Sequence, residues 1–380
     1  MNVSIIGWYG TETLGDRAIL IGILKVLSSI DEEMNISLGS LAPFFTRRTL
    51  AEDAKIYLKI NPKLNIELFD SRDSIQIKKQ VANSDLIIMG GGPLLDITEI
   101  EIIRYTFELG KKLHKKTMIF GCGIGPLVYK QNRKIVAQIL KKTDLAIFRD
   151  KRGVEEAKIL CPLESSGNWH HCHDPAILSI MDYESPRVES KSNTISINCR
   201  KFPSSAFGGM RINKEDFLIK MIQRASEFYE NVKLVPMHTF HMGGDDRKYL
   251  SELCLRSCRS NVSVQHKPMN LYGLFDVFSK SDACIGMRYH SVVFQTLLNG
   301  NNYILDYTES KKGKISGFLD CIDTNFYKDR IVNLQESMPP GELIEQSLCL
   351  LKRNRSFIYS SSIFDETLEF YKKKITELLK

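Results

Sequence analysis

Short apolar runs recur along the chain, end at glycine or polar residues, and alternate with segments of helical periodicity. The first run is residues 3–6, and later ones lie at 85–89, 117–120 and 145–148. Uninterrupted apolar strands are typical of a parallel sheet that is covered on both faces. Strands that alternate with helices form βαβ units. The pattern therefore predicts a doubly wound α/β domain in the first half of the chain.

The second half repeats this pattern after a charged stretch, residues 182–193, that contains Ser-Pro and has the composition of a linker. A chain of 380 residues is also too long for one ordinary core. We therefore expect an α/β protein with two Rossmann-like domains, residues 1–184 and 185–345. C-terminal helices in residues 346–380 are expected to pack back on them.

Composition and charge narrow the class of protein. The chain has 43% apolar and 26% charged residues, and its net charge of +7 comes from scattered Lys and Arg, which argues against nucleic-acid binding. Nine cysteines without a CxxC pair indicate reduced thiols in a cytoplasmic protein. No apolar run reaches the roughly 20 residues of a membrane span, although the positive charge permits association with the inner face of the cytoplasmic membrane.

The most informative stretch for function is residues 287–291, which lie between an apolar strand and a buried helix. It contains Arg288, Tyr289 and His290. An Arg fork suits a carboxylate or phosphate, and a His exchanges protons near neutral pH. The stretch therefore predicts an acidic substrate and proton transfer. The alternative is that Arg288 pairs with a nearby carboxylate and His290 caps the helix.

Glycines and acidic residues follow several other strands. Gly15 and Asp16 precede the first helix, where Asp16 either caps the helix or holds a sugar hydroxyl, with capping favoured. Gly91 and Gly92 offer backbone amides to a ligand, or simply form a turn. The glycine spacing after the first strand is not GxGxxG, so a dinucleotide site is not favoured.

Residues 169–175 contain three His and one Cys, which could hold zinc. Adjacent side chains on an extended segment point to opposite faces, so these four cannot converge without a bend. We therefore favour His173 or Asp174 as residues that line an interdomain cleft, and we predict no metal and no cofactor. Arg149 and Asp150 follow the preceding strand. They either pair with each other, or Asp150 caps the next helix.

An ordered set of short motifs resembles the polysaccharide pyruvyl transferase family. The motifs are Leu14-Gly15-Asp16, Gly90-Gly91-Gly92, Gly123-Ile124-Gly125-Pro126, Phe148-Arg149-Asp150, Asp174-Pro175-Ala176, Arg200, and Met287-Arg288-Tyr289-His290. The resemblance implies two Rossmann-like domains that face each other across a cleft, the GT-B arrangement. It also implies transfer of a pyruvyl group from phosphoenolpyruvate to two hydroxyls of a sugar, which leaves a cyclic ketal and releases phosphate.

The resemblance further implies roles for individual residues. Arg200, Arg288 and His290 are expected to bind the donor, with His290 as the acid/base, and Lys314 matches a family lysine. Tyr289 is also expected to be a donor-binding residue, although it stands where the family usually has Leu. The acceptor is expected to be a sugar of a surface polysaccharide or its lipid-linked precursor, bound by the first domain. Candidates for contact with the acceptor or cleft are Gly15, Asp16, Gly91, Gly92, Arg149, His173, Asp174, His238 and Asp245. A GT-B glycosyltransferase that uses a nucleotide sugar and a non-catalytic relative are the alternatives.

Overall fold

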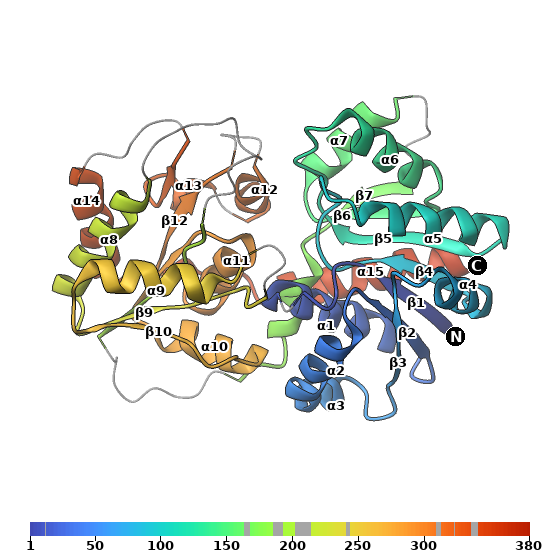
Figure 1. The fold of residues 1–380 in the computed structure, drawn as a ribbon, viewed down its shortest axis with the longest axis horizontal. Coiled ribbons are helices and arrows are strands. Elements are labelled where there is room, and N and C mark those ends of the chain that lie inside the picture. The colour runs from blue at the N-terminus through green and yellow to red at the C-terminus, as the bar shows by residue number, and fades with distance from the viewer. Residues whose placement is uncertain are drawn as a thin grey trace. The chain divides into compact units, whose positions relative to one another are not determined.

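The chain forms two compact units, residues 1–181 with 361–380, and residues 182–360. Figure 1 shows that each unit contains a sheet with helices packed around it. The computed structural model describes residues 1–11, 13–162, 168–184, 193–201, 214–240, 244–308, 313–322, 324–335 and 341–380. Most of the predicted linker, residues 185–192, therefore lies outside the described residues.

The sheet of the first unit has seven parallel strands in the order β3-β2-β1-β4-β5-β6-β7. The strands are β1 Asn2–Ile6, β2 Asn35–Ser40, β3 Asn65–Asp70, β4 Leu86–Met89, β5 Lys116–Cys122, β6 Leu145–Phe148 and β7 Trp169–His171. The chain first winds outward through β2 and β3 and then returns to the other side of β1. This reversal creates a topological switch point between the carboxyl ends of β1 and β4, where doubly wound folds bind ligands.

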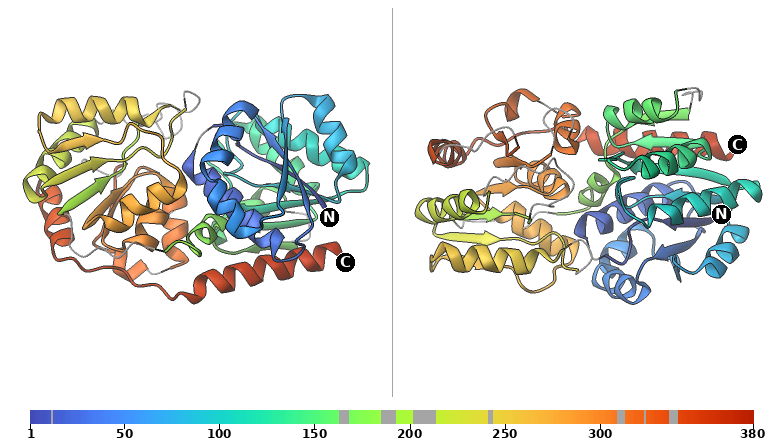
Figure 2. Two further views of the ribbon diagram at one scale, coloured as in Figure 1. Left: turned by 90° about the horizontal axis from the view of Figure 1, so that it is seen from below. Right: turned by 45° about the horizontal axis from the view of Figure 1, so that its top comes forward.

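Helices cover both faces of this sheet. They are α1 Leu14–Ser28, α2 Pro43–Glu52, α3 Ala54–Ile60, α4 Ser74–Asn83, α5 Ile100–Lys112, α6 Lys130–Lys141, α7 Lys151–Leu160, the 3-10 helix η2 Pro175–Ile180, and α15 Ser362–Leu379. Helix α1 is buried on nearly every side because η2 and α15 both pack against it. In Figure 2, α15 runs as a long helix beside this unit, so the C-terminal segment packs back on the N-terminal sheet.

Two acidic residues at helix starts differ in role. Helix α1 begins at Leu14 with Thr13 at its N-cap position, so Asp16 is not the N-cap residue. Asp16 instead lies in the first turn, where a negative charge is favoured by the helix dipole. Asp150 caps α7, because its Oδ1 accepts a hydrogen bond of 2.8 Å from the backbone N–H of Gly153.

Gly22 allows the close contact between α1 and η2. A Cβ atom at this position would lie 2.0 Å from the carbonyl oxygen of Pro175, which is backbone and cannot rotate away. We expect Gly22→Ala to lower the free energy of unfolding by about 1–3 kcal/mol, although Ala is the better helix former. Urea denaturation measures the change. Gly341→Ala is the control, since nothing lies within 4 Å of its Cβ position; equal stability of both variants would contradict the packing argument.

The sheet of the second unit has six parallel strands in the order β10-β9-β8-β11-β12-β13. The strands are β8 Thr194–Ile197, β9 Asn231–Leu234, β10 Val262–Val264, β11 Ala283–Gly286, β12 Asn302–Asp306 and β13 Ile331–Asn333. Its switch point lies between β8 and β11. Both sheets thus have the strand order of a Rossmann fold, and the predicted pair of Rossmann-like domains is confirmed.

The helices of the second unit are α8 Lys214–Phe228, α9 Asp246–Ser257, α10 Leu271–Lys280, α11 Tyr289–Leu298, α12 Lys314–Asp320, α13 Thr324–Tyr327 and α14 Gly341–Lys352. Helix α14 packs against α8 of the same unit. The two C-terminal helices are therefore divided, with α14 in the second unit and α15 in the first. Among the described residues, none of the helices is both long and apolar enough to cross a membrane.

Candidate functional site

Three cations gather at the carboxyl edge of the second sheet. Arg200 follows β8, Arg288 follows β11, and Lys314 begins α12. They surround Tyr307, which follows β12: Nη1 of Arg200 lies 3.4 Å from the Tyr307 hydroxyl oxygen, and Nζ of Lys314 lies 5.6 Å from the centroid of its ring. We call Arg200, Arg288 and Lys314 the cation cluster. Because Arg200 and Arg288 flank the switch point, the cluster occupies the usual ligand position of this fold.

The electrostatics of Tyr307 reflect these neighbours. The side chain is only 2% exposed. Burial raises the pKa of its hydroxyl, but the positive charges of Lys314, Arg200 and Arg288, with a hydrogen bond to Lys314, lower this pKa to about 7. A phenol that ionises near neutral pH shows how strongly this part of the site attracts negative charge.

Arg288 is held by a buried carboxylate. Its Nε donates to Oδ2 of Asp246 at 2.7 Å and its Nη2 to Oδ1 at 2.5 Å. Asp246 is nearly inaccessible and also accepts hydrogen bonds from the backbone N–H groups of Met237 and His238. The alternative that Arg288 pairs with a carboxylate is therefore observed. A guanidinium has five N–H donors, so the fork fixed by Asp246 still presents three to a ligand.

The backbone at the start of α11 is fixed by Asn198, which follows β8 across the switch point. Its Oδ1 accepts from the backbone N–H of Arg288 at 3.0 Å and from Oγ of Ser291 at 2.8 Å. Its Nδ2 donates to the carbonyl oxygen of Val235. The buried side-chain amide of Asn198 thus connects the ends of β8, β9 and β11 and fixes the backbone from which the side chains of Arg288 and His290 extend.

His290 lies in the first turn of α11, and its ring is held between aromatic neighbours. The ring centroid is 4.9 Å from that of Tyr289, at a steep angle, and 6.2 Å from that of Phe294, nearly parallel. Tyr289 is 4% exposed and also contacts Phe318 of α12 edge to face. The structure therefore places Tyr289 in the packing between α11 and α12, where it orients His290.

His238 and Asp245 lie in the connection between β9 and α9. Asp245 caps α9 and pairs with Arg247, whose hydrogen bonds lower the pKa of this carboxyl. His238 is 5% exposed, and its backbone N–H donates to Asp246. Asp245 is thus a stabilised carboxylate and a poor base, whereas His238 supports the carboxylate that holds Arg288.

In the first unit, Gly91 and Gly92 follow β4 at the switch point. Both have positive φ, and Cβ atoms there would collide with the rings of Tyr9 and Trp8, respectively. The glycines therefore make room for aromatic side chains. Asp16 Oδ1 would lie 3.4 Å from a Cβ of Gly92, so Asp16 and these glycines are neighbours. The candidates around the first switch point are brought together, with Gly15 buried in the same helical turn as Asp16.

Arg149 and Asp174 form a buried pair at the ends of β6 and β7. Nη1 of Arg149 lies 3.6 Å from Oδ2 of Asp174, and their side chains are 3% and 1% exposed. The hydroxyl of Tyr371 in α15 donates a hydrogen bond to the backbone carbonyl oxygen of His173, and burial lowers the pKa of the His173 imidazole. Among the described residues, no group of three or more His, Cys, Asp or Glu could hold a metal ion.

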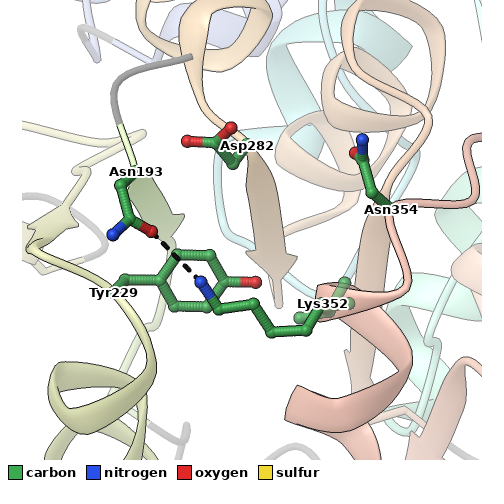
Figure 3. Close-up of a pocket in the computed structure, with 6 residues that line it drawn as sticks. Asn193, Tyr229, Asp282, Lys352 and Asn354 are labelled. Atoms are coloured by element: carbon green, nitrogen blue, oxygen red, sulfur yellow. Dashed lines mark hydrogen bonds between the residues drawn. The ribbon is translucent and has the colours of Figure 1, made fainter.

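A hollow of about 300 Å³ lies at the opposite, amino edge of the second sheet (Figure 3). Its lining residues are Asn193, Tyr229, Asp282, Leu351, Lys352 and Asn354. The ammonium of Lys352 already donates to Asn193 Oδ1 at 3.1 Å and lies 4.0 Å from the ring centroid of Tyr229. Since α/β folds bind ligands at the carboxyl edge, the cation cluster is the better candidate site.

Comparison with known protein families shows which family this chain belongs to. The model of the polysaccharide pyruvyl transferase family matches residues 14–309. The chain belongs to this family. The matched range includes Arg200, Arg288, His290 and Tyr307, whereas Lys314 lies just beyond it. No curated protein sequence matches the chain significantly.

Several solved structures have a similar fold at low sequence identity. A putative UDP-N-acetylglucosamine 2-epimerase from Listeria monocytogenes has a TM-score of 0.60 and 13% identity, over 99% of this chain and 94% of its own. The UDP-GlcNAc 2-epimerase from Neisseria meningitidis, bound to UDP-GlcNAc, has 0.57 and 12%, over 100% and 99%. HepE from Anabaena, in complex with UDP and glucose, has 0.58 and 11%, over 100% and 98%. These likenesses support the fold of two Rossmann-like domains.

Membership of the pyruvyl transferase family makes a transferase that modifies polysaccharide the coarse functional class of this chain. Within that class, the sequence predicts donor-site roles for Arg200, Arg288, Tyr289, His290 and Lys314, and the structure brings the three cations to one edge of one sheet. It adds two residues that the sequence reasoning missed, Tyr307 among the cations and Asp246 behind Arg288. The only sequence signal for Tyr307 is its position at the end of the strand before Lys314.

Proposed function

We propose that this pyruvyl transferase family member transfers the pyruvyl group of phosphoenolpyruvate to two hydroxyls of one sugar and forms a cyclic ketal. The cation cluster of Arg200, Arg288 and Lys314 is the observation that carries the proposal. Phosphoenolpyruvate has a carboxylate and a phosphate on three carbons. Two Arg forks bind such oxygens in pairs, and a Lys adds a point charge, so the positive charge of the cluster suits the carboxylate and phosphate of the donor.

The chemistry requires an acid at the methylene carbon of the donor. A proton from His290 to this carbon gives positive character at C2, which the first sugar hydroxyl attacks as it loses its own proton. Phosphate then leaves C2, and the second hydroxyl closes the ketal. The balance is one donor and one diol to one ketal and one phosphate. A positioned general acid/base contributes typically about 10²- to 10⁴-fold to the rate.

The acceptor is assigned to the first unit. Asp16 and Trp8 line a small pocket in that unit, and a carboxylate and an indole are groups that suit sugar hydroxyls and a sugar face. The acceptor is a sugar of a surface polysaccharide or its lipid-linked precursor. A lipid-linked acceptor would bring the protein to the inner face of the cytoplasmic membrane, where its net charge of +7 favours anionic lipids.

Thermal denaturation with phosphoenolpyruvate or UDP tests the donor. A ligand that binds only the folded state adds about 2.7 kcal/mol at a hundredfold excess over its Kd, which gives a clear rise in Tm. We expect this rise with phosphoenolpyruvate and a loss of it in Arg200→Ala. Arg256→Ala is the matched control, since Arg256 pairs with exposed carboxylates of the same unit. A rise with UDP alone would instead assign the cluster to the diphosphate of a nucleotide sugar.

A further inference from the structure

Tyr307 brings an ionisable hydroxyl into the middle of the cation cluster. The cations reach it from three elements: Arg200 after β8, Arg288 at the start of α11, and Lys314 at the start of α12. The carboxylate of Asp246 in α9 is bound to Arg288. The carboxylate of the adjacent Asp306 accepts from Thr308 and is occupied there. The described charged groups that act on the Tyr307 hydroxyl are thus mainly positive.

We propose that Tyr307 is a proton-uptake residue of the donor site: its hydroxyl is ionised when no donor is bound and takes one proton from solvent when phosphoenolpyruvate binds. This inference rests on the proposed function, because it takes phosphoenolpyruvate as the anion. The step is a simple protonation of the phenolate oxygen and needs no other reactant. In the bound state Tyr307 becomes a hydrogen-bond donor that can face a carboxylate or phosphate oxygen.

Electrostatics gives the direction of this change. Without a donor, the three cations stabilise the phenolate, and the pKa of the hydroxyl is lowered to about 7. At pH 8.5 the carboxylate and phosphate of the donor are fully ionised, since a phosphate monoester loses its second proton near pH 6. These charges neutralise the cations and repel a phenolate beside them, so the pKa of Tyr307 rises on binding. The proton is therefore bound together with the donor.

The same linkage fixes the pH dependence of donor affinity. Above pH 7 the free protein carries the phenolate, and the donor complex carries one proton more. The apparent affinity for phosphoenolpyruvate therefore falls by about tenfold for each pH unit above 7. Below pH 7 the hydroxyl is protonated in both states and contributes no slope. Tyr307→Phe has no proton to exchange, so this part of the slope disappears.

Two signals from the wild-type protein test the inference at pH 8.5. The first is the ultraviolet absorbance of tyrosinate during titration with phosphoenolpyruvate, and the second is the proton count from calorimetry in two buffers of different ionisation enthalpy. We expect a loss of about one tyrosinate and an uptake of about one proton per bound donor, and neither at pH 6. Tyr307→Phe should lose both signals. Tyr303→Phe, which alters a buried tyrosine of β12 with a raised pKa, should keep them.

The outcomes separate the inference from the proposed function. Heat of phosphoenolpyruvate binding without a tyrosinate change in the wild type overturns the role of Tyr307 and leaves the donor assignment intact. If phosphoenolpyruvate does not bind but UDP causes a loss of tyrosinate, the donor assignment is wrong. The result would still support Tyr307 as the residue that takes up a proton when an anion binds. Because both signals come from the wild type, the test holds even if Tyr307→Phe does not fold.

Discussion

Arg288→Ala lowers the free energy of unfolding by about 3–5 kcal/mol and abolishes the rise in Tm with phosphoenolpyruvate. The stability loss follows from Asp246, whose carboxylate is 2% exposed and receives two hydrogen bonds from the guanidinium. Among the described residues, removal of Arg288 leaves this buried charge with the backbone N–H groups of Met237 and His238 as its hydrogen-bond partners. Urea denaturation measures the first effect, and thermal denaturation with donor measures the second.

Arg247, which follows Asp246 in helix α9, offers a matched control. Arg247 also pairs with an aspartate, Asp245, but both side chains are about 30% exposed. An exposed pair contributes about 0–1 kcal/mol, so Arg247→Ala should change stability little and leave donor binding intact. A second variant, Arg288→Ala with Asp246→Ala, removes the buried charge and should recover part of the stability without donor binding. If Arg288→Ala costs no more than Arg247→Ala, the Asp246 pair does not have the role assigned to it.

His290→Ala reduces kcat by about 10²- to 10⁴-fold and changes the Kd for phosphoenolpyruvate by much less. In the proposed reaction, the cations supply most of the attraction for the donor, whereas the imidazole supplies the proton in the transition state. Rapid-quench turnover and calorimetry measure the two quantities separately. His266→Ala alters an exposed imidazole of the same unit and should change neither. An equal loss of affinity and turnover in His290→Ala would make His290 a donor ligand instead of the acid/base.

Much of the fold follows from local pattern. The apolar run at residues 86–89 is the central strand β4. It can be recognised in the sequence because a strand covered on both faces has no alternating polar residues. The glycines and polar residues that end such runs mark the carboxyl edges of both sheets. The position of Arg288 between an apolar strand and a buried helix therefore indicates the proposed donor site without any knowledge of strand order.

The pairings within the site depend on tertiary structure. Asp246 lies 42 positions before Arg288, and its carboxylate reaches the guanidinium only because β9 and β11 flank β8 in the sheet. Tyr307 ends an apolar strand and looks like a core residue until three cations from separate segments meet at its hydroxyl. Gly91 and Gly92 show the converse, since glycines that suggest a ligand loop are needed to make room for Tyr9 and Trp8.

The most direct test of the proposed reaction is NMR of ¹³C-labelled phosphoenolpyruvate incubated with the protein and a surface glycan whose ketals have been removed by mild acid. The account predicts a new quaternary ketal carbon on the glycan and release of one phosphate per ketal, both absent in His290→Ala. Unchanged phosphoenolpyruvate together with glycosyl transfer from a nucleotide sugar to the same glycan would contradict it.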